Sequence, residues 1–248
     1  ERNPVKMIRK FFRILLLSIL PVYLLAMFFI FADRVEEEIC KEVRIAIKDS
    51  TDAPFLKIRD IEHALNRLRV KPEGKPLNEI NTYEIGHALE ENPIIRSACC
   101  YKTPDGTLRI DIYQRNPIMR VFGLTGNYYI DEEGFLLPAA NNFTAYVPVA
   151  SGYVTKDLAS TDLLRFAIFL QKNSFWNAQI EQVYIRPNGE AELIPRVGNH
   201  TILLGDFQNF EKKLENLLTF YQEGLNKKGW NVYKTINLKY ENQVIGIK

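Results

Sequence analysis

The chain has 248 residues, of which 46% are hydrophobic and 25% are charged, the composition of an ordinary globular protein. Its 32 Lys and Arg residues nearly balance its 30 Asp and Glu residues, and the formal net charge is +2. No basic stripe with interleaved aromatic residues follows residue 13. Composition and charge therefore exclude an electrostatic case for nucleic-acid binding.

The most apolar part of the chain is the uncharged stretch Ile14–Ala32. As a helix rising ~1.5 Å per residue it would be roughly 28 Å long, the thickness of the hydrocarbon core of a bilayer. A buried core helix or the apolar region of a signal peptide is the alternative, but both are usually shorter. The pattern predicts one membrane-spanning helix over residues 14–32.

The charges on either side of this stretch indicate its orientation. Basic residues precede it (Arg2, Lys6, Arg9, Lys10 and Arg13), and acidic residues follow it (Asp33, Glu36, Glu37 and Glu38). Because Lys and Arg mark the cytoplasmic side, we expect a cytoplasmic tail at 1–13 and an extracytoplasmic body after a juxtamembrane linker at 33–42. No small-x-small pair closes the apolar run, so we expect no signal-peptidase cleavage.

The three cysteines, Cys40, Cys99 and Cys100, do not form a disulfide framework, since their number is odd and two are adjacent. Adjacent strand residues point to opposite faces, which disfavours a bond between Cys99 and Cys100. A bond from Cys40 to either of them stays open. The three histidines do not supply a zinc site at motif spacing, and no metal or cofactor is predicted.

Residues 43–115 are predicted to form a small α+β domain in the order strand, helix, helix, strand, strand. The strands are expected at 43–47, 95–102 and 108–115, and the helices at 60–68 and 81–92. Asp60 and Asn81 are the expected N-caps, and Asn92-Pro93 ends the second helix. Leu108, Ile110 and Ile112 alternate with polar residues, which predicts one buried and one wet face.

Residues 116–248 are predicted to form a mixed β-domain with two helices and a C-terminal strand. Strands are expected at 118–122, 127–130, 135–138, 146–149, 180–186, 191–197, 201–204 and 235–240, with a weaker one at 243–248. Ser160 is the expected cap of the first helix, and the second runs from about 207 to 226 before Gly229.

No motif in the chain carries a reaction. There is no nucleophile elbow, no phosphate-binding loop and no paired-histidine metal motif. Glu132 and Glu133 stand together in a turn and are expected to be solvated, and His200 is expected to be a loop residue. No catalytic residue is predicted, although an enzyme whose residues meet only in three dimensions stays open.

A terminal strand is often an edge strand, whose unpaired N–H and C=O groups can pair with a partner strand. That edge can equally be shielded within the protein, and the residues alone leave both readings open.

The chain resembles the bacterial cell-division family FtsQ/DivIB. The residues that carry the resemblance are Asn92–Ile95, Gln114–Ile118, Tyr129–Asp131 with Gly134, Val147–Val149 and Asn237–Tyr240. Each string is short, but their order and spacing together are specific, and the resemblance covers nearly the whole chain. The resemblance implies one membrane helix, a POTRA-like βααββ domain and a β-domain of the FtsQ type. The cysteines are not a feature of that family.

The resemblance also implies a function: a non-enzymatic scaffold of the division machinery at the septum, anchored in the inner membrane with its body in the periplasm. Its implied partners are FtsB-like and FtsL-like proteins, which relay control to the septal peptidoglycan synthase, with other division proteins contacting the POTRA-like domain. The partner strand would pair with the backbone of residues 235–244. The predicted partner-binding residues are Asn237, Leu238, Lys239, Tyr240, Asn242 and Val244.

Two other functions remain as alternatives. A POTRA-bearing assembly or translocation chaperone of the envelope would be expected to carry repeated POTRA modules or a barrel-like tail. An anchored envelope hydrolase would need convergent polar groups in a deep pocket.

Overall fold

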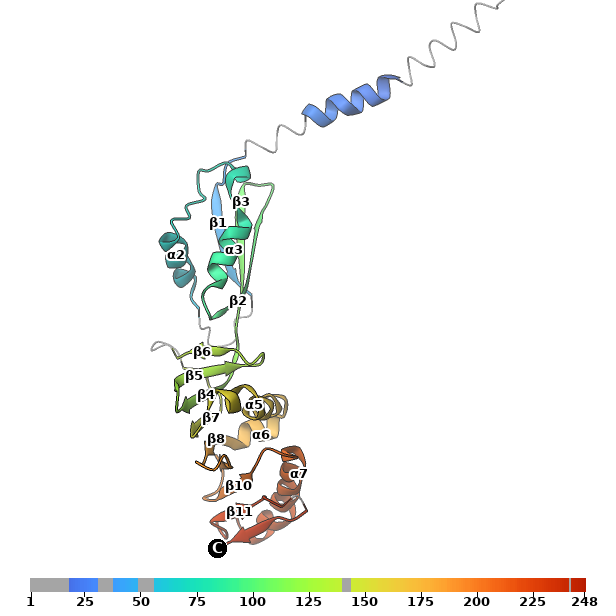
Figure 1. Cartoon of the computed structure of the whole chain (residues 1–248). Coiled ribbons are helices and arrows are strands. Elements are labelled where there is room, and N and C mark those ends of the chain that lie inside the picture. The colour runs from blue at the N-terminus through green and yellow to red at the C-terminus, as the bar shows by residue number, and fades with distance from the viewer. Residues whose placement is uncertain (1–17, 31–37, 49–55, 140–143, 241) are drawn as a thin grey trace, which may run out of the picture. The chain divides into compact units, whose positions relative to one another are not determined.

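The computed structural model describes residues 18–30, 38–48, 56–139, 144–240 and 242–248 (Figure 1). The chain divides into two compact units, Glu1–Gln114 and Arg115–Lys248. Residues 18–30 are helical and their apolar side chains are exposed. Within the described residues, no helix is both long and apolar enough to cross a membrane. The rest of the predicted span and the tail at 1–13 lie outside the described residues.

The first unit confirms the predicted βααββ order. Its elements are β1 (Glu42–Ile47), α2 (Ile58–Arg67), the short 3-10 helix η2 (Leu77–Glu79), α3 (Thr82–Glu90), β2 (Ile95–Lys102) and β3 (Thr107–Gln114). The sheet order is β1-β3-β2, with β1 parallel and β2 antiparallel to the central strand β3. The one turn of η2 was not predicted.

The two helix starts of this unit differ in how well the sequence predicted them. Asn81 is the N-cap of α3, since its side chain accepts a hydrogen bond from the Glu84 N–H at 3.3 Å. Asp60 is not an N-cap, because α2 begins two residues before it with Lys57 as the cap. Instead, Asp60 lies in the first turn and accepts a hydrogen bond from the Lys57 N–H at 2.8 Å. This contact satisfies a donor at the helix start.

The core of the first unit lies between the two helices and β3. Leu108, Ile110 and Ile112 are fully buried, which confirms the predicted alternation along this strand. Cys99 is exposed and Cys100 partly buried, as expected for adjacent strand residues, and both are free thiols, as is the buried Cys40. Burial raises the pKa of the Cys100 thiol to about 11.

The second unit is built on a nine-stranded sheet in the order β12-β11-β10-β9-β8-β7-β4-β5-β6. Its strands are β4 (Pro117–Gly123), β5 (Gly126–Asp131), β6 (Leu136–Pro138), β7 (Val149–Gly152), β8 (Ile180–Ile185), β9 (Ala191–Pro195), β10 (Thr201–Gly205), β11 (Thr235–Asn237) and β12 (Ile245–Ile247). Most of the predicted strands are found. The strand predicted at 146–149 begins only at Val149, since pairing with β4 and β8 sets its position.

The prediction of two helices in this unit is wrong. The described residues contain α4 (Lys156–Ser160), α5 (Asp162–Lys172), α6 (Ser174–Gln179), α7 (Phe210–Phe220), the π-helical turn η3 (Tyr221–Leu225) and α8 (Asn226–Lys228). Ser160 ends α4 and does not cap a helix, because Thr155 accepts the capping bond from the Leu158 N–H at 3.2 Å. The long second helix is interrupted by η3, and Gly229 follows its end with φ +99°.

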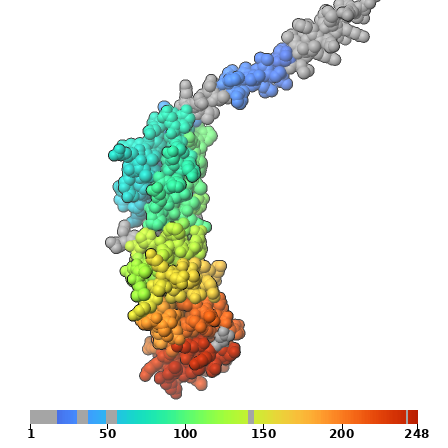
Figure 2. All heavy atoms as spheres, in the orientation of Figure 1, coloured from blue at the N-terminus to red at the C-terminus, as the bar shows by residue number. Residues whose placement is uncertain are grey.

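The helices of the second unit cover one face of its sheet. Figure 1 shows α5, α6 and α7 along that side. Phe166 is fully buried, and its ring centroid lies 5.5 Å from that of Phe207 and 5.2 Å from that of Phe210. These aromatic contacts join α5 to the start of α7. Figure 2 shows the C-terminal residues, in red, at one end of this unit.

His200 lies in the loop before β10, as expected, but its side chain is buried rather than exposed. The imidazole Nε2 lies 2.8 Å from the hydroxyl of Tyr221, and the rings of Tyr221 and Trp230 lie 4.9 Å apart. Burial lowers the pKa of the His200 imidazole below its ordinary value. The folded protein therefore favours the neutral ring.

We expect this histidine to make the second unit less stable in acid. Because its pKa is lower in the folded state, its contribution is fully present above the unfolded pKa of about 6.5 and is lost as pH falls below that value. Both tryptophans, Trp176 and Trp230, belong to this unit, so their fluorescence in urea reports its unfolding. His200→Gln should flatten the loss between about pH 7 and pH 5, and His87→Gln, an exposed position on α3, should not. Equal pH dependence in His200→Gln and the unsubstituted chain would contradict this assignment.

Candidate partner-binding edge

The C-terminal strand β12 is the outermost strand of the nine-stranded sheet. It pairs antiparallel with β11, with Thr235 opposite Ile247 and Asn237 opposite Ile245. On its other side β11 pairs parallel with β10. Among the described residues, no strand pairs with the outer side of β12. Of the two readings that the residues alone left open, the structure therefore gives that of an edge strand, and the edge is that of β12.

The expected ladder along residues 235–244 needs a correction. The strand predicted at 235–240 ends at Asn237, and the backbone of β11 is already paired on both sides, with β10 and β12. Its N–H and C=O groups are not free for a partner strand. The open edge is displaced by one strand, to Ile245–Ile247.

The predicted partner-binding residues lie in different environments. Leu238 is only 1% exposed, and its N–H donates to the Leu203 carbonyl at 2.9 Å, so its side chain belongs to the core. Asn237 accepts a hydrogen bond from the Lys239 N–H at 2.9 Å. Tyr240 is 57% exposed. Asn242 is exposed, and Val244 is half-buried against the core. The exposed members are therefore Tyr240 and Asn242.

The strand β12 itself was missed as a site because its pattern covers only three residues. Ile245 and Ile247 are exposed, and Gly246 between them faces the ring of Tyr233. A Cβ added to Gly246 would lie 2.6 Å from that ring, so only glycine fits there without a shift. Strand β12 thus has one face covered by an aromatic ring and one face carrying two exposed isoleucines. The alternation Ile-Gly-Ile was the available signal.

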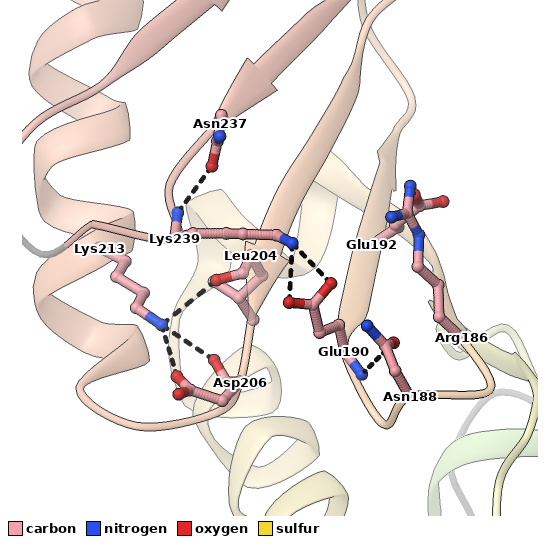
Figure 3. A network of polar contacts seen from close by, with 9 residues as sticks. All are labelled: Arg186, Asn188, Glu190, Glu192, Leu204, Asp206, Lys213, Asn237 and Lys239. Atoms are coloured by element: carbon pink, nitrogen blue, oxygen red, sulfur yellow. Dashed lines mark hydrogen bonds and ion pairs between the residues drawn. The ribbon is translucent and has the colours of Figure 1, made fainter.

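Two ion pairs join separate elements around β10 and the end of β11 (Figure 3). The Lys239 ammonium lies 2.7 Å and 2.6 Å from the two carboxylate oxygens of Glu190. Hydrogen bonding by Lys239 lowers the pKa of the Glu190 carboxyl, and Asn188 adds to the effect. The buried Lys213 ammonium on α7 donates to the Leu204 carbonyl at 3.2 Å and to the Asp206 carboxylate at 2.8 Å. Neither pair was predicted, since the partners come from separate elements.

The described residues have three further sheet edges, β6 in this unit and β1 and β2 in the first unit. The opposite edge, β6, ends at Pro138, which has no N–H to donate. In the first unit, β1 is an edge strand beside a groove of about 400 Å³, whose lining includes Val43, Ile45 and Leu65. Among the described residues, no group of three or more His, Cys, Asp and Glu side chains gathers as a metal site.

Comparison with known proteins gives the same division of the chain. The model of the family described as "FtsQ/DivIB, C-terminal related" matches residues 116–246, and that of the POTRA-like domain matches residues 38–113. The chain is similar to the cell division protein FtsQ of Rhodothermus marinus, with 25% identity over 195 residues, which are 73% of this chain and 70% of that protein. Since the first model covers more than half of the chain, the chain belongs to the FtsQ/DivIB family of cell-division proteins.

Proposed function

We propose that this protein is a non-enzymatic scaffold of the division machinery that captures an FtsB-like partner by adding its strand to β12. The observation that carries the proposal is the open outer edge of β12, at the end of the nine-stranded sheet. An FtsL-like protein joins the same complex. The chain is anchored in the inner membrane at the division septum, with the POTRA-like residues 38–113 and the unit Arg115–Lys248 outside the cytoplasm.

The chemistry of the edge fits a partner strand. Backbone N–H and C=O groups of β12 supply the hydrogen bonds, each worth about 0.5–1.5 kcal/mol net. Three residues provide only a few such bonds, so side chains must supply much of the affinity. Ile245 and Ile247 offer an apolar face, and Tyr240 is an exposed aromatic ring close to it in sequence. Aromatic residues commonly carry a large share of binding energy.

The scaffold role follows from this capture. By holding FtsB-like and FtsL-like proteins together, the protein links them to the septal peptidoglycan synthase. Membership of the FtsQ/DivIB family and the similarity to a cell division protein support this role. The POTRA-like unit offers a separate sheet with its own edge strands, and in this proposal it contacts other division proteins.

The test is capture of the extracytoplasmic segment of the FtsB-like protein from the same organism by the full chain in detergent. Tyr240→Glu and deletion of residues 245–248 should each weaken capture at least about 30-fold, which is the loss of a hot spot worth 2 kcal/mol or more. Tyr146→Glu is the matched control, because Tyr146 is a fully exposed tyrosine outside the β11–β12 region. It should leave capture unchanged.

Two outcomes would count against the proposal. If the unsubstituted chain captures neither the FtsB-like nor the FtsL-like segment, the scaffold function is wrong. If capture is strong and survives both Tyr240→Glu and the deletion, the partner binds elsewhere and the assignment of β12 is wrong.

A further inference from the structure

Lys239 and Glu190 connect two parts of the sheet that lie far apart in the sequence. Lys239 follows β11, and Glu190 directly precedes β9, 49 residues earlier. Strand β10 lies between these two strands. Figure 3 shows the Lys239 side chain extended past the end of β10 toward Glu190. The ion pair therefore spans three neighbouring strands at one end of the sheet.

The backbone of each partner in this ion pair is held by further hydrogen bonds. The Glu190 N–H donates to the Asn188 side chain at 3.2 Å, and the Glu190 carbonyl accepts from the Arg186 N–H at 2.9 Å. At the other end the Lys239 N–H donates to Asn237. The Lys239 stem packs on Gly205, where an added Cβ would lie 3.1 Å from the Lys239 Cγ. The absence of a side chain at Gly205 leaves the room that the lysine stem occupies.

The ion pair lies where the chain leaves the core. Leu238, just before it, is buried, and Tyr240, just after it, is exposed. Asn242 and Gln243 are also exposed, and the next regular element is the three-residue strand β12. Lys239 therefore lies at the start of the segment that leads to β12, and its ion pair with Glu190 is one of the contacts that attach this part of the chain to the sheet.

We infer that Lys239 is a positioning residue, which acts on partner capture through Glu190 by fixing Tyr240 and the segment that leads into β12. This inference rests on the proposed function, in which the partner binds at that edge. Glu190, a residue of the β8–β9 turn, would then affect partner capture without contacting the partner itself. Both carboxylate oxygens of Glu190 are already engaged by the Lys239 ammonium.

The test exchanges the two charges. Lys239→Glu and Glu190→Lys should each weaken capture of the FtsB-like segment by about three- to tenfold, the loss typical of one partly exposed ion pair. The double variant, which restores an opposite-charge pair, should bind within about twofold of the unsubstituted chain. Lys212→Glu is the control, since Lys212 forms an exposed ion pair with Glu215 at 2.9 Å on α7. It should change capture little.

Hydrogen exchange of the backbone amides over residues 238–247 provides a second readout that needs no partner. Exchange should be faster in both single variants and should return toward its original rate in the double variant. Unfolding in urea should change little, because the pair is partly exposed.

Each contrary result has a distinct meaning. If Glu190→Lys leaves both capture and exchange unchanged, Lys239 does not act through Glu190 and the inference is overturned. Failure of the double variant to recover capture, with exchange restored, would show that Lys239 contacts the partner directly, which also overturns it. If the unsubstituted chain captures no partner, the proposed function fails, while the exchange rates still decide whether the ion pair fixes this segment.

Discussion

Replacement of Asp131 by alanine should lower the free energy of unfolding of the unit Arg115–Lys248 by about 3–5 kcal/mol, the cost of breaking a buried ion pair. Asp131 is 2% exposed, and one carboxylate oxygen lies 2.9 Å from the Arg115 guanidinium. The other oxygen accepts hydrogen bonds from the N–H groups of Glu133 at 3.0 Å and Phe135 at 2.7 Å. Alanine leaves the largely buried guanidinium without this partner and leaves two turn N–H groups without their acceptor.

Glu133→Ala is the matched control for this prediction. Glu133 contacts the same guanidinium at 2.8 Å, but its side chain is 43% exposed. Because exposed ion pairs contribute little, its loss should cost no more than about 1 kcal/mol. Urea denaturation followed by tryptophan fluorescence measures both variants, since both tryptophans lie in this unit. If the two substitutions lowered the free energy of unfolding equally, burial would not make the Asp131–Arg115 ion pair stronger than the Glu133–Arg115 ion pair.

The second large effect is expected at Phe166. Phe166→Ala should lower the free energy of unfolding of the same unit by about 3–5 kcal/mol, because it removes a large buried ring and leaves a cavity. The ring is fully buried, and it contacts Phe207 and Phe210 in the layer between α5 and α7. Loss of the ring also removes a favourable edge-to-face contact with Phe210.

Phe122→Ala provides the comparison for Phe166. The Phe122 side chain is exposed on β4, and the Arg120 guanidinium lies 4.7 Å from its ring centroid. Its removal should cost about 1 kcal/mol or less, the size of an exposed cation–π contact. A loss at Phe166 no larger than the loss at Phe122 would mean that α5 and α7 repack around the vacant volume.

The βααββ order of the first unit was predictable because its strands and its two α-helices have local signals, although the single turn η2 was not predicted. The alternation at Leu108, Ile110 and Ile112 and the cap at Asn81 both lie within a few neighbouring residues. The break at Thr161 had no such signal, since no glycine or proline separates α4 from α5. Strand β7 has the sequence Val-Ala-Ser-Gly, and its position depends on pairing with strands distant in the sequence.

The candidate site was only partly predictable. The terminal position of the last strand left an open edge and a shielded strand equally open, and the folded sheet gives β12 as an edge strand. Which strand forms the edge depends on pairing across the sheet, which moved it from the region of Tyr240 to Ile245–Ile247. Lys239 and Glu190 are 49 residues apart, so no local pattern could pair them. Long-range side-chain contacts of this kind require the folded structure.

The order of strands in the sheet also bears on when the binding edge is completed during synthesis. The chain makes the opposite edge, β6, early in this unit, whereas β11 and β12 follow every other strand of the sheet. Strand β12 can be placed only after β11 has paired with β10. A chain whose synthesis stops before residue 235 therefore lacks both β11 and β12. If the partner binds at β12, as proposed, only chains made through that strand can capture it.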